Sequence, residues 1–253
     1  MLRTSSRLAF GFALTVAVSG PLMSTAQAAP IFYTDWTSAT VATAGSASGT
    51  ILTPGGPVTV TYTGQVHSPT QTSCGADFWN ANPAIYAGSP ADNGPGRDPN
   101  NPAVASSANL RCDMISMTGG SGVGVSTFSF DRPILNPIMS ILSLGQGGVG
   151  AELIFDQSFT IISQGNGWYG GSPTALTKIE GNARGGDTLK GFEGHGAIMF
   201  EGSFQTLTWT MPIFENWYGF TIGVQGIATP APGALALFGV GALGLLGLRR
   251  RKR

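Results

Sequence analysis

The chain has few of the residues that most often carry chemistry in proteins. Of its 253 residues, two are histidines, two are cysteines and only 10% are charged. A zinc site needs three or four ligands at a recognisable spacing, which His67 and His195 do not supply. Neither cysteine has a histidine close to it in the sequence, so we expect no catalytic thiol. We therefore expect a protein without catalytic residues, metal or cofactor, and not an enzyme.

The chain also lacks, before residue 229, any long segment with the 3.6-residue hydrophobic period of an amphipathic helix. Several segments alternate between apolar and polar residues instead. In 58–67, Val58, Val60 and Tyr62 alternate with threonines, and in 204–211 Leu207, Trp209 and Met211 do the same. Short strands separated by glycine and proline turns predict an all-β fold, an antiparallel β-sandwich of jelly-roll type.

Other segments give more specific expectations. We expect 31–48 to be a strand followed by a flexible link, and 151–162 to be two short strands that meet at Asp156 and Gln157. Pro133 and Pro137 place the apolar run 134–144 at a sheet edge or at a strand entry. Glycines predict a loop over 165–194. We expect 204–211 and 218–224 to pair as an antiparallel hairpin.

The first 28 residues resemble a secretory signal peptide. Arg3 and Arg7 are positive, 8–18 is apolar, and Ala26-Gln27-Ala28 is a small-residue cleavage site. An N-terminal membrane anchor is the alternative, which the short apolar run disfavours. Cleavage after Ala28 would leave a body, 29–228, in which six Lys and Arg oppose 13 Asp and Glu. That net charge of −7 disfavours nucleic acid and anionic lipid as partners.

Cys74 and Cys112 are the only cysteines, and in an exported chain such a pair favours a disulfide. The bond would be worth about 4 kcal/mol in the chain-entropy model. It would hold together the edges of a long, irregular, proline-rich segment over 68–109. Two buried thiols are the alternative.

The end of the chain has three parts. Pro230, Ala231 and Pro232 come first, and 233–248 is apolar and without charge. A helix over 233–248 would span roughly 24 Å, a short transmembrane segment beside the ~30 Å hydrocarbon core. Five cations follow and should stay on the cytoplasmic side: Arg249, Arg250, Arg251, Lys252 and Arg253. A buried core helix is the alternative, but an all-round apolar segment ending in five cations packs poorly into a soluble core.

This order of prolines, short apolar span and arginine-rich end resembles the PEP-CTERM sorting signal of Gram-negative bacteria. Ala231 stands where the family usually has glutamate. The resemblance implies an exosortase-like processing enzyme, a transient precursor in the inner membrane, and a mature protein at the cell surface or in the extracellular matrix. Such tails also carry a label taken from ice-binding proteins, and the tail alone gives no support for ice binding. The block 214–224 also resembles the body of other exosortase-sorted proteins with sandwich folds.

Four features of the body are candidate sites. Glu193 and His195 would form a metal or base pair, or a structural turn. Residues 92–101 offer oxygen ligands for calcium, or are a solvated loop. Exposed aromatic residues would stack on sugars, or pack in the core: Trp168, Tyr169 and Trp217. A glycoside hydrolase would need two of four glutamates across a cleft: Glu180, Glu193, Glu201 and Glu215.

These features lead to three hypotheses for function. The first is an exported, non-enzymatic protein of the cell surface or extracellular matrix, sorted by its tail after removal of residues 1–28. The first alternative is a carbohydrate-binding module that contacts exopolysaccharide through Trp168 and Tyr169. The second alternative is a polysaccharide hydrolase.

Overall fold

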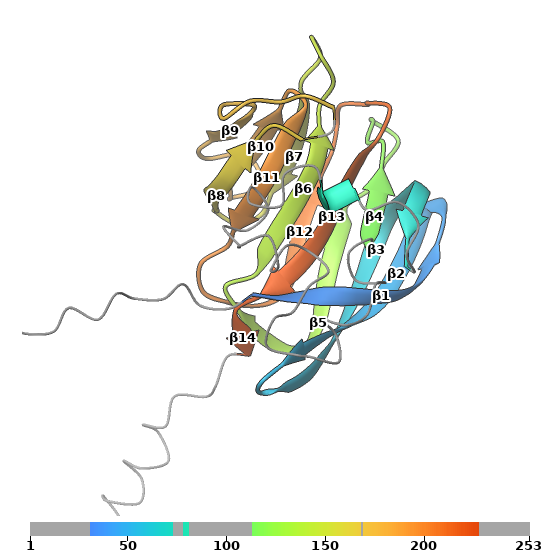
Figure 1. The fold of residues 1–253 in the computed structure, drawn as a ribbon, viewed down its shortest axis with the longest axis vertical. Helices are drawn as coiled ribbons and strands as arrows, with labels where there is room; N and C mark the ends of the chain where they lie inside the picture. Colours follow the sequence, from blue (N-terminus) through green and yellow to red (C-terminus); the bar gives the residue numbers. More distant parts are fainter. Residues whose placement is uncertain (1–30, 73–77, 81–112, 168, 228–253) are drawn as a thin grey trace, which may run out of the picture.

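The computed structural model shows a fold built from β-strands (Figure 1). It describes residues 31–72, 78–80, 113–167 and 169–227. Over these ranges the chain forms 14 strands and one short 3-10 helix, and none of its helices is long and apolar enough to cross a membrane. The expectation of an all-β body is therefore confirmed. The predicted signal peptide, disulfide and transmembrane segment lie outside the described residues.

The first seven strands are β1 (Phe32–Thr40), β2 (Ala42–Thr53), β3 (Gly56–Gln71), β4 (Met114–Met117), β5 (Ser126–Leu135), β6 (Ile138–Leu144) and β7 (Ala151–Phe155). The others are β8 (Thr160–Gly165), β9 (Leu176–Ile179), β10 (Thr188–Gly191), β11 (Gly194–Met199), β12 (Ser203–Thr210), β13 (Tyr218–Val224) and β14 (Gly226–Ile227). The 3-10 helix η1 is Phe78–Asn80.

Hydrogen bonds join all 14 strands into one sheet. Its main path is β8-β11-β6-β13-β1-β2-β3-β5-β12-β7-β10-β9, with β14 beside β5. β1 pairs with β13 through Phe32 and Tyr33 and with β2 from Thr34 onward. β4 pairs with both β13 and β3, which closes a ring through β1 and β2. Two separate sheets, as in the expected jelly-roll sandwich, are not confirmed because β1 and β3 continue from one layer into the other.

The alternating segments form strands as predicted. Val58, Val60 and Tyr62 in β3 are buried, and the threonines between them are exposed. In β12, Leu207 and Trp209 are buried and Thr206 is exposed. The pattern works because successive side chains of a strand point to opposite faces, so one face reaches the core and the other stays in water. The two short strands expected over 151–162 are also present, as β7 and the start of β8.

The predicted hairpin between 204–211 and 218–224 is wrong. β12 pairs with β5 and β7, whereas β13 pairs with β1, β4 and β6. The run 134–144 is not at a sheet edge, but the alternative of a strand entry fits Pro137, which stands directly before β6. The run contains β6, which is fully buried between β11 and β13. Its prolines do not interrupt a ladder, because Pro137 precedes the strand and Pro133 lies where β5 and β12 shift register.

Two predicted loops also contain strands. The expected flexible link after β1 is the first part of β2, whose small residues let it approach β1 closely. A side chain at Gly49 would collide with the backbone of Asp35. The glycine-rich loop over 165–194 contains β9 and β10, which pair with each other and with β7. Local composition missed these strands because their stability comes from pairing with distant segments.

The strand connections define two ends of the sheet. Five connections gather at what we call the loop end, at the top of Figure 1: residues 118–125, 145–150, 166–175, 192–193 and 211–217. Backbone hydrogen bonds tie them together, from Glu193 N to Gly145 O (2.9 Å) and from Glu215 N to Thr118 O (2.8 Å). The opposite, terminal end holds both limits of the described chain, where Phe32 pairs with Val224.

Candidate functional site

Two of the three non-glycine residues with positive φ in the described chain lie at the loop end; the third, Asn136, lies between β5 and β6. Ser143 and Glu193 have φ angles of +59° and +52°, in the left-handed region that residues other than glycine rarely adopt. The two residues contact each other, since the Ser143 hydroxyl donates a 2.6 Å hydrogen bond to Glu193 Oε2. The end of β6 is thereby fixed to the β10–β11 turn. Strain of this kind persists only where the surroundings hold it, and it is often found at functional sites.

His195 lies directly behind this pair. Its side chain is fully buried, and Nδ1 accepts a 3.2 Å hydrogen bond from the Ser143 amide. A side chain on Gly167 would collide with the imidazole ring, so the β8–β9 connection covers it closely. Burial lowers the pKa of His195 to about 4, which leaves the ring neutral at neutral pH. These contacts favour a structural turn over a base pair for Glu193 and His195.

Glu215 is the second acid of the loop end, and its side chain is only 1% exposed. Burial raises its pKa to about 8; the amide of Gly145 opposes this shift and the negative charge of Glu193 adds to it. Its Oε1 has no hydrogen-bond partner among the described residues. At neutral pH Glu215 therefore keeps its proton. A side chain so deeply covered does not touch a polymer outside the protein.

Of the four glutamates considered for hydrolysis, Glu193 and Glu215 lie near each other at the loop end, where the negative charge of Glu193 acts on Glu215. Glu180 and Glu201 are exposed and lie around Lys178, since Glu180 Oε1 is 3.5 Å from Lys178 Nζ and Glu201 lines the same hollow as Lys178. Among the four, the sequence pointed to Glu193 only as a partner of His195, and nothing in the sequence indicated that Glu193 and Glu215 would meet, since 22 positions separate them. Ser143 was missed entirely. Its one signal is that it is a polar residue in the otherwise apolar end of β6.

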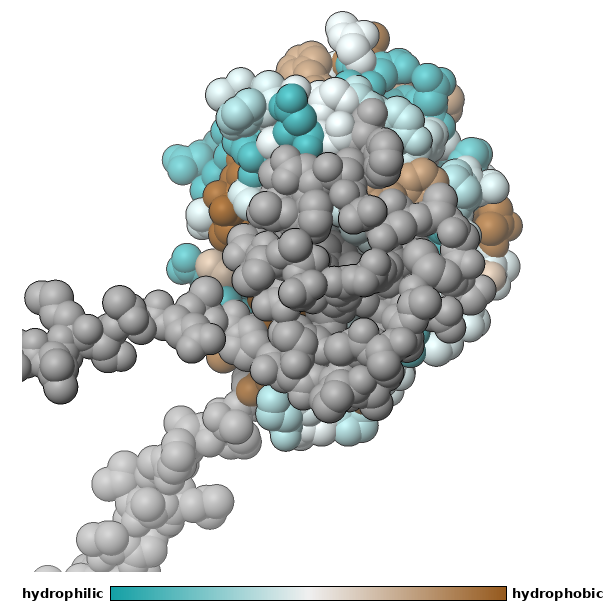
Figure 2. Space-filling view, in the orientation of Figure 1, coloured by the Kyte–Doolittle hydropathy of each residue, from teal (hydrophilic) through white to brown (hydrophobic). Residues whose placement is uncertain are grey.

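Aromatic side chains also form a cluster at the loop end. Tyr169 and Trp217 meet edge to face, with ring centroids 5.5 Å apart, and Phe78 of η1 contacts Trp217 at the same distance. Tyr169 is 50% exposed, as expected of a residue proposed to contact sugars. Trp168 lies outside the described residues. Figure 2 shows hydrophobic residues as separate patches among hydrophilic ones on the visible face.

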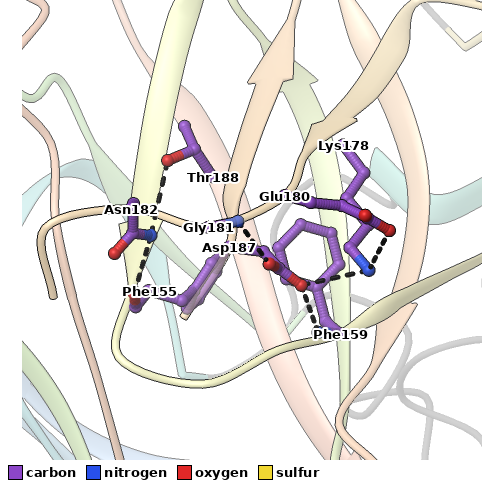
Figure 3. A network of polar contacts seen from close by, with 8 residues as sticks. All are labelled: Phe155, Phe159, Lys178, Glu180, Gly181, Asn182, Asp187 and Thr188. Atoms are coloured by element: carbon purple, nitrogen blue, oxygen red, sulfur yellow. Dashed lines mark hydrogen bonds and ion pairs between the residues drawn. The ribbon is translucent and has the colours of Figure 1, made fainter. Parts of the chain in front are cut away.

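A second polar network surrounds Asp187, in the connection between β9 and β10 (Figure 3). Asp187 accepts hydrogen bonds from the Gly181 amide (3.0 Å) and the Phe159 amide (3.3 Å), and its carboxylate is 3.0 Å from Lys178 Nζ. Burial alone would raise the pKa of Asp187, but these partners hold it below its usual value. Lys178 also lines an open hollow with Phe159 and Glu201. The ammonium group of Lys178 is paired with Asp187. We therefore interpret this network as one that holds the β9–β10 connection in place.

Metal-binding geometry is not found in the described part of the chain, where no group of three or more His, Cys, Asp or Glu side chains could hold an ion. The calcium candidate, residues 92–101, lies outside that part. The same holds for Cys74 and Cys112, for the motif of Pro230, Ala231 and Pro232, and for the terminal cations.

Comparison with known proteins bears on the end of the chain. A family model described as the PEP-CTERM protein-sorting motif matches residues 228–252. No curated protein and no solved structure matches the chain.

Proposed function

The chain carries a PEP-CTERM protein-sorting motif, and from this premise we propose that it is a non-enzymatic protein displayed at the cell surface or in the extracellular matrix. The motif supports export, a membrane-anchored precursor and processing by an exosortase-like enzyme. This single observation carries the proposal.

The positions of the chain ends support display. The described chain begins at Ile31 and ends at Ile227, and both lie at the terminal end, where a side chain on Gly223 would touch Ile31. The tail that carries the sorting motif follows directly after Ile227. A protein held by that tail would present the loop end, on the far side of the sheet, away from the membrane (Figure 1).

The acidic residues of the loop end support a non-enzymatic role. A catalytic carboxyl group must reach its substrate and exchange a proton with it. Glu215 is buried, Glu193 is bonded to Ser143, and His195 is covered by the β8–β9 connection. We therefore interpret all three side chains as groups that stabilise the loop end.

Replacing Pro230 and Pro232 together by alanine is expected to block processing, because it removes the proline pair that marks the start of the signal. The precursor should then accumulate in the inner membrane, and little protein should reach the surface. Cell fractionation and surface labelling of the full chain would measure this. Pro212→Ala, in an exposed loop of the body, is the matched control and should be sorted normally. Unchanged processing and display of the double variant would contradict the sorting proposal.

A second candidate function is binding of exopolysaccharide at the loop end. The contact between Tyr169 and Trp217 favours it, because a half-exposed aromatic ring supported by a second ring is a suitable surface for a sugar.

Tyr169→Ala is expected to weaken retention of the full chain on an immobilised polysaccharide by about tenfold, the size of effect seen when a central aromatic contact is removed. Affinity chromatography on a panel of polysaccharides measures it. Val41→Ala is the control, since Val41 is 59% exposed and lies outside the loop end. Absence of retention on every polysaccharide of the panel would remove this candidate.

A further inference from the structure

We infer that the loop end is an extended binding face for an uncharged polysaccharide, with Tyr169, Phe192 and Phe214 as three separate stacking positions. The inference rests on the proposed carbohydrate-binding function. It adds the class of polymer and two positions that the sequence did not suggest.

The exposed aromatic residues are distributed unevenly over the described surface. Nine large hydrophobic residues are exposed there, and the three aromatic ones among them are Tyr169 (50%), Phe192 (44%) and Phe214 (61%). All three belong to loop-end connections. Single exposed hydrophobic residues are ordinary, but a concentration of rings on one end marks an interaction surface.

Each ring comes from a different connection, and these connections contact one another. The Phe192 amide donates a 3.0 Å hydrogen bond to Ala175 O, which links the β10–β11 turn to the connection that carries Tyr169. Asn216, two residues after Phe214, donates a 3.0 Å hydrogen bond to Gln146 Oε1. The rings are thus spread over one joined surface, as several units of a polymer require.

The backbone beneath the rings is fixed before any ligand arrives. The Ser143–Glu193 hydrogen bond holds the turn next to Phe192. The Glu215 amide, bonded to Thr118 O, holds the residue next to Phe214. Loops that are already ordered lose little conformational entropy on binding, so weak stacking contacts suffice to give measurable affinity.

The polar groups around the rings select against a charged polymer. The exposed side-chain pair of the loop end, Gln146 and Asn216, consists of amides, which bond to sugar hydroxyls without carrying charge. Lys190, whose ammonium lies 5.5 Å from the centroid of the Phe192 ring, is 3.4 Å from Glu152 Oε1, which compensates its charge. The body carries a net charge of −7, which repels acidic polysaccharides. A neutral, extended glycan fits these groups.

The test is a binding series with the full chain. The probes are immobilised β-1,3-glucan, β-1,4-glucan and dextran as neutral polymers, alginate as an acidic one, and soluble glucans of two and six sugar units. We expect a neutral polymer to bind more tightly than alginate, and the six-unit glucan more tightly than the two-unit one. Phe192→Ala and Phe214→Ala should each weaken binding of the six-unit glucan by about tenfold, as Tyr169→Ala does.

Leu52→Ala is the control for these variants, because Leu52 is 38% exposed and lies near the terminal end. Thermal unfolding of each variant shows that it still folds, and Phe192→Leu tests whether the ring itself is needed. If Phe192→Ala and Phe214→Ala bind normally while Tyr169→Ala does not, the extended face is refuted and the carbohydrate-binding proposal stands. Preference for alginate would refute the class of polymer. No binding to any probe would refute both.

Discussion

Trp209→Ala is expected to lower the free energy of unfolding by roughly 3–5 kcal/mol, the usual loss when a buried tryptophan is truncated. Trp209 is fully buried on β12. Its ring centroid lies 5.1 Å from that of Phe128 and 5.6 Å from that of Phe220, so it joins strands from both layers of the fold. Since folded domains are stable by about 5–15 kcal/mol, this single change removes a large fraction of the total.

The loss of stability in Trp209→Ala should come from packing alone. Trp209 Nε1 has no hydrogen-bond partner in the described chain, so the substitution breaks no hydrogen bond and leaves no other polar group unpaired. Urea unfolding followed by tryptophan fluorescence and circular dichroism would measure the difference. Tyr169→Ala is the matched control, because it removes a half-exposed ring and should change stability by less than about 1 kcal/mol. Equal effects of the two variants would mean that the aromatic cluster does not stabilise the core.

The free energy of unfolding is also expected to fall as the pH rises from about 6.5 to about 8. Two buried carboxyl groups cause this. Burial raises the pKa of Glu215 from 4.5 to about 8. Burial likewise raises that of Asp113 from 3.8 to about 8, with the Trp36 amide opposing the shift and Asp35 adding to it. Both groups hold a proton in the folded protein at pH values where the unfolded chain has lost it.

In that range the folded state binds more protons than the unfolded state, so stability declines by about 1.4 kcal/mol per pH unit for each group. His195 acts in the opposite direction. Burial lowers its pKa from 6.5 to about 4, so its neutral form in the folded state makes stability rise with pH between those values. That effect fades over the pH unit above 6.5, where the unfolded chain loses its last histidine protons, and beyond it the carboxyl groups act almost alone. The combined slope is about 2 kcal/mol per unit near pH 7 and levels off above pH 8.

Glu215→Gln separates the two contributions. Glutamine has nearly the same shape and does not titrate, so the slope between pH 6.5 and 8 should fall to about half. Urea unfolding at several pH values in this interval measures it. Glu201→Gln changes an exposed glutamate and should leave the slope as it is. A wild-type protein whose stability does not change across the interval would contradict the proposed proton uptake.

The features that could be predicted from the sequence are those encoded by one continuous stretch of residues. The sorting motif at 228–252 is one. The strand around Val58, Val60 and Tyr62 is another, because alternation along one strand already fixes which face is buried. β2 and β10 were missed because the glycines, alanines and serines of β2, and the lysine and glycine in the short β10, have a weak intrinsic preference for strands. They form strands only when a neighbouring strand supplies the hydrogen bonds.

By itself, then, the sequence determined the sorting tail, the acidic charge and all-β nature of the body, and the faces of its clearest strands. The tertiary structure decided which strands pair, and therefore separated β12 from β13 and closed the ring through β4. It also brought Ser143, Glu193 and Glu215 together under the exposed rings of the loop end. Backbone hydrogen bonds between strands are the same for almost any side chain, so partners distant in sequence are selected only when the whole core packs.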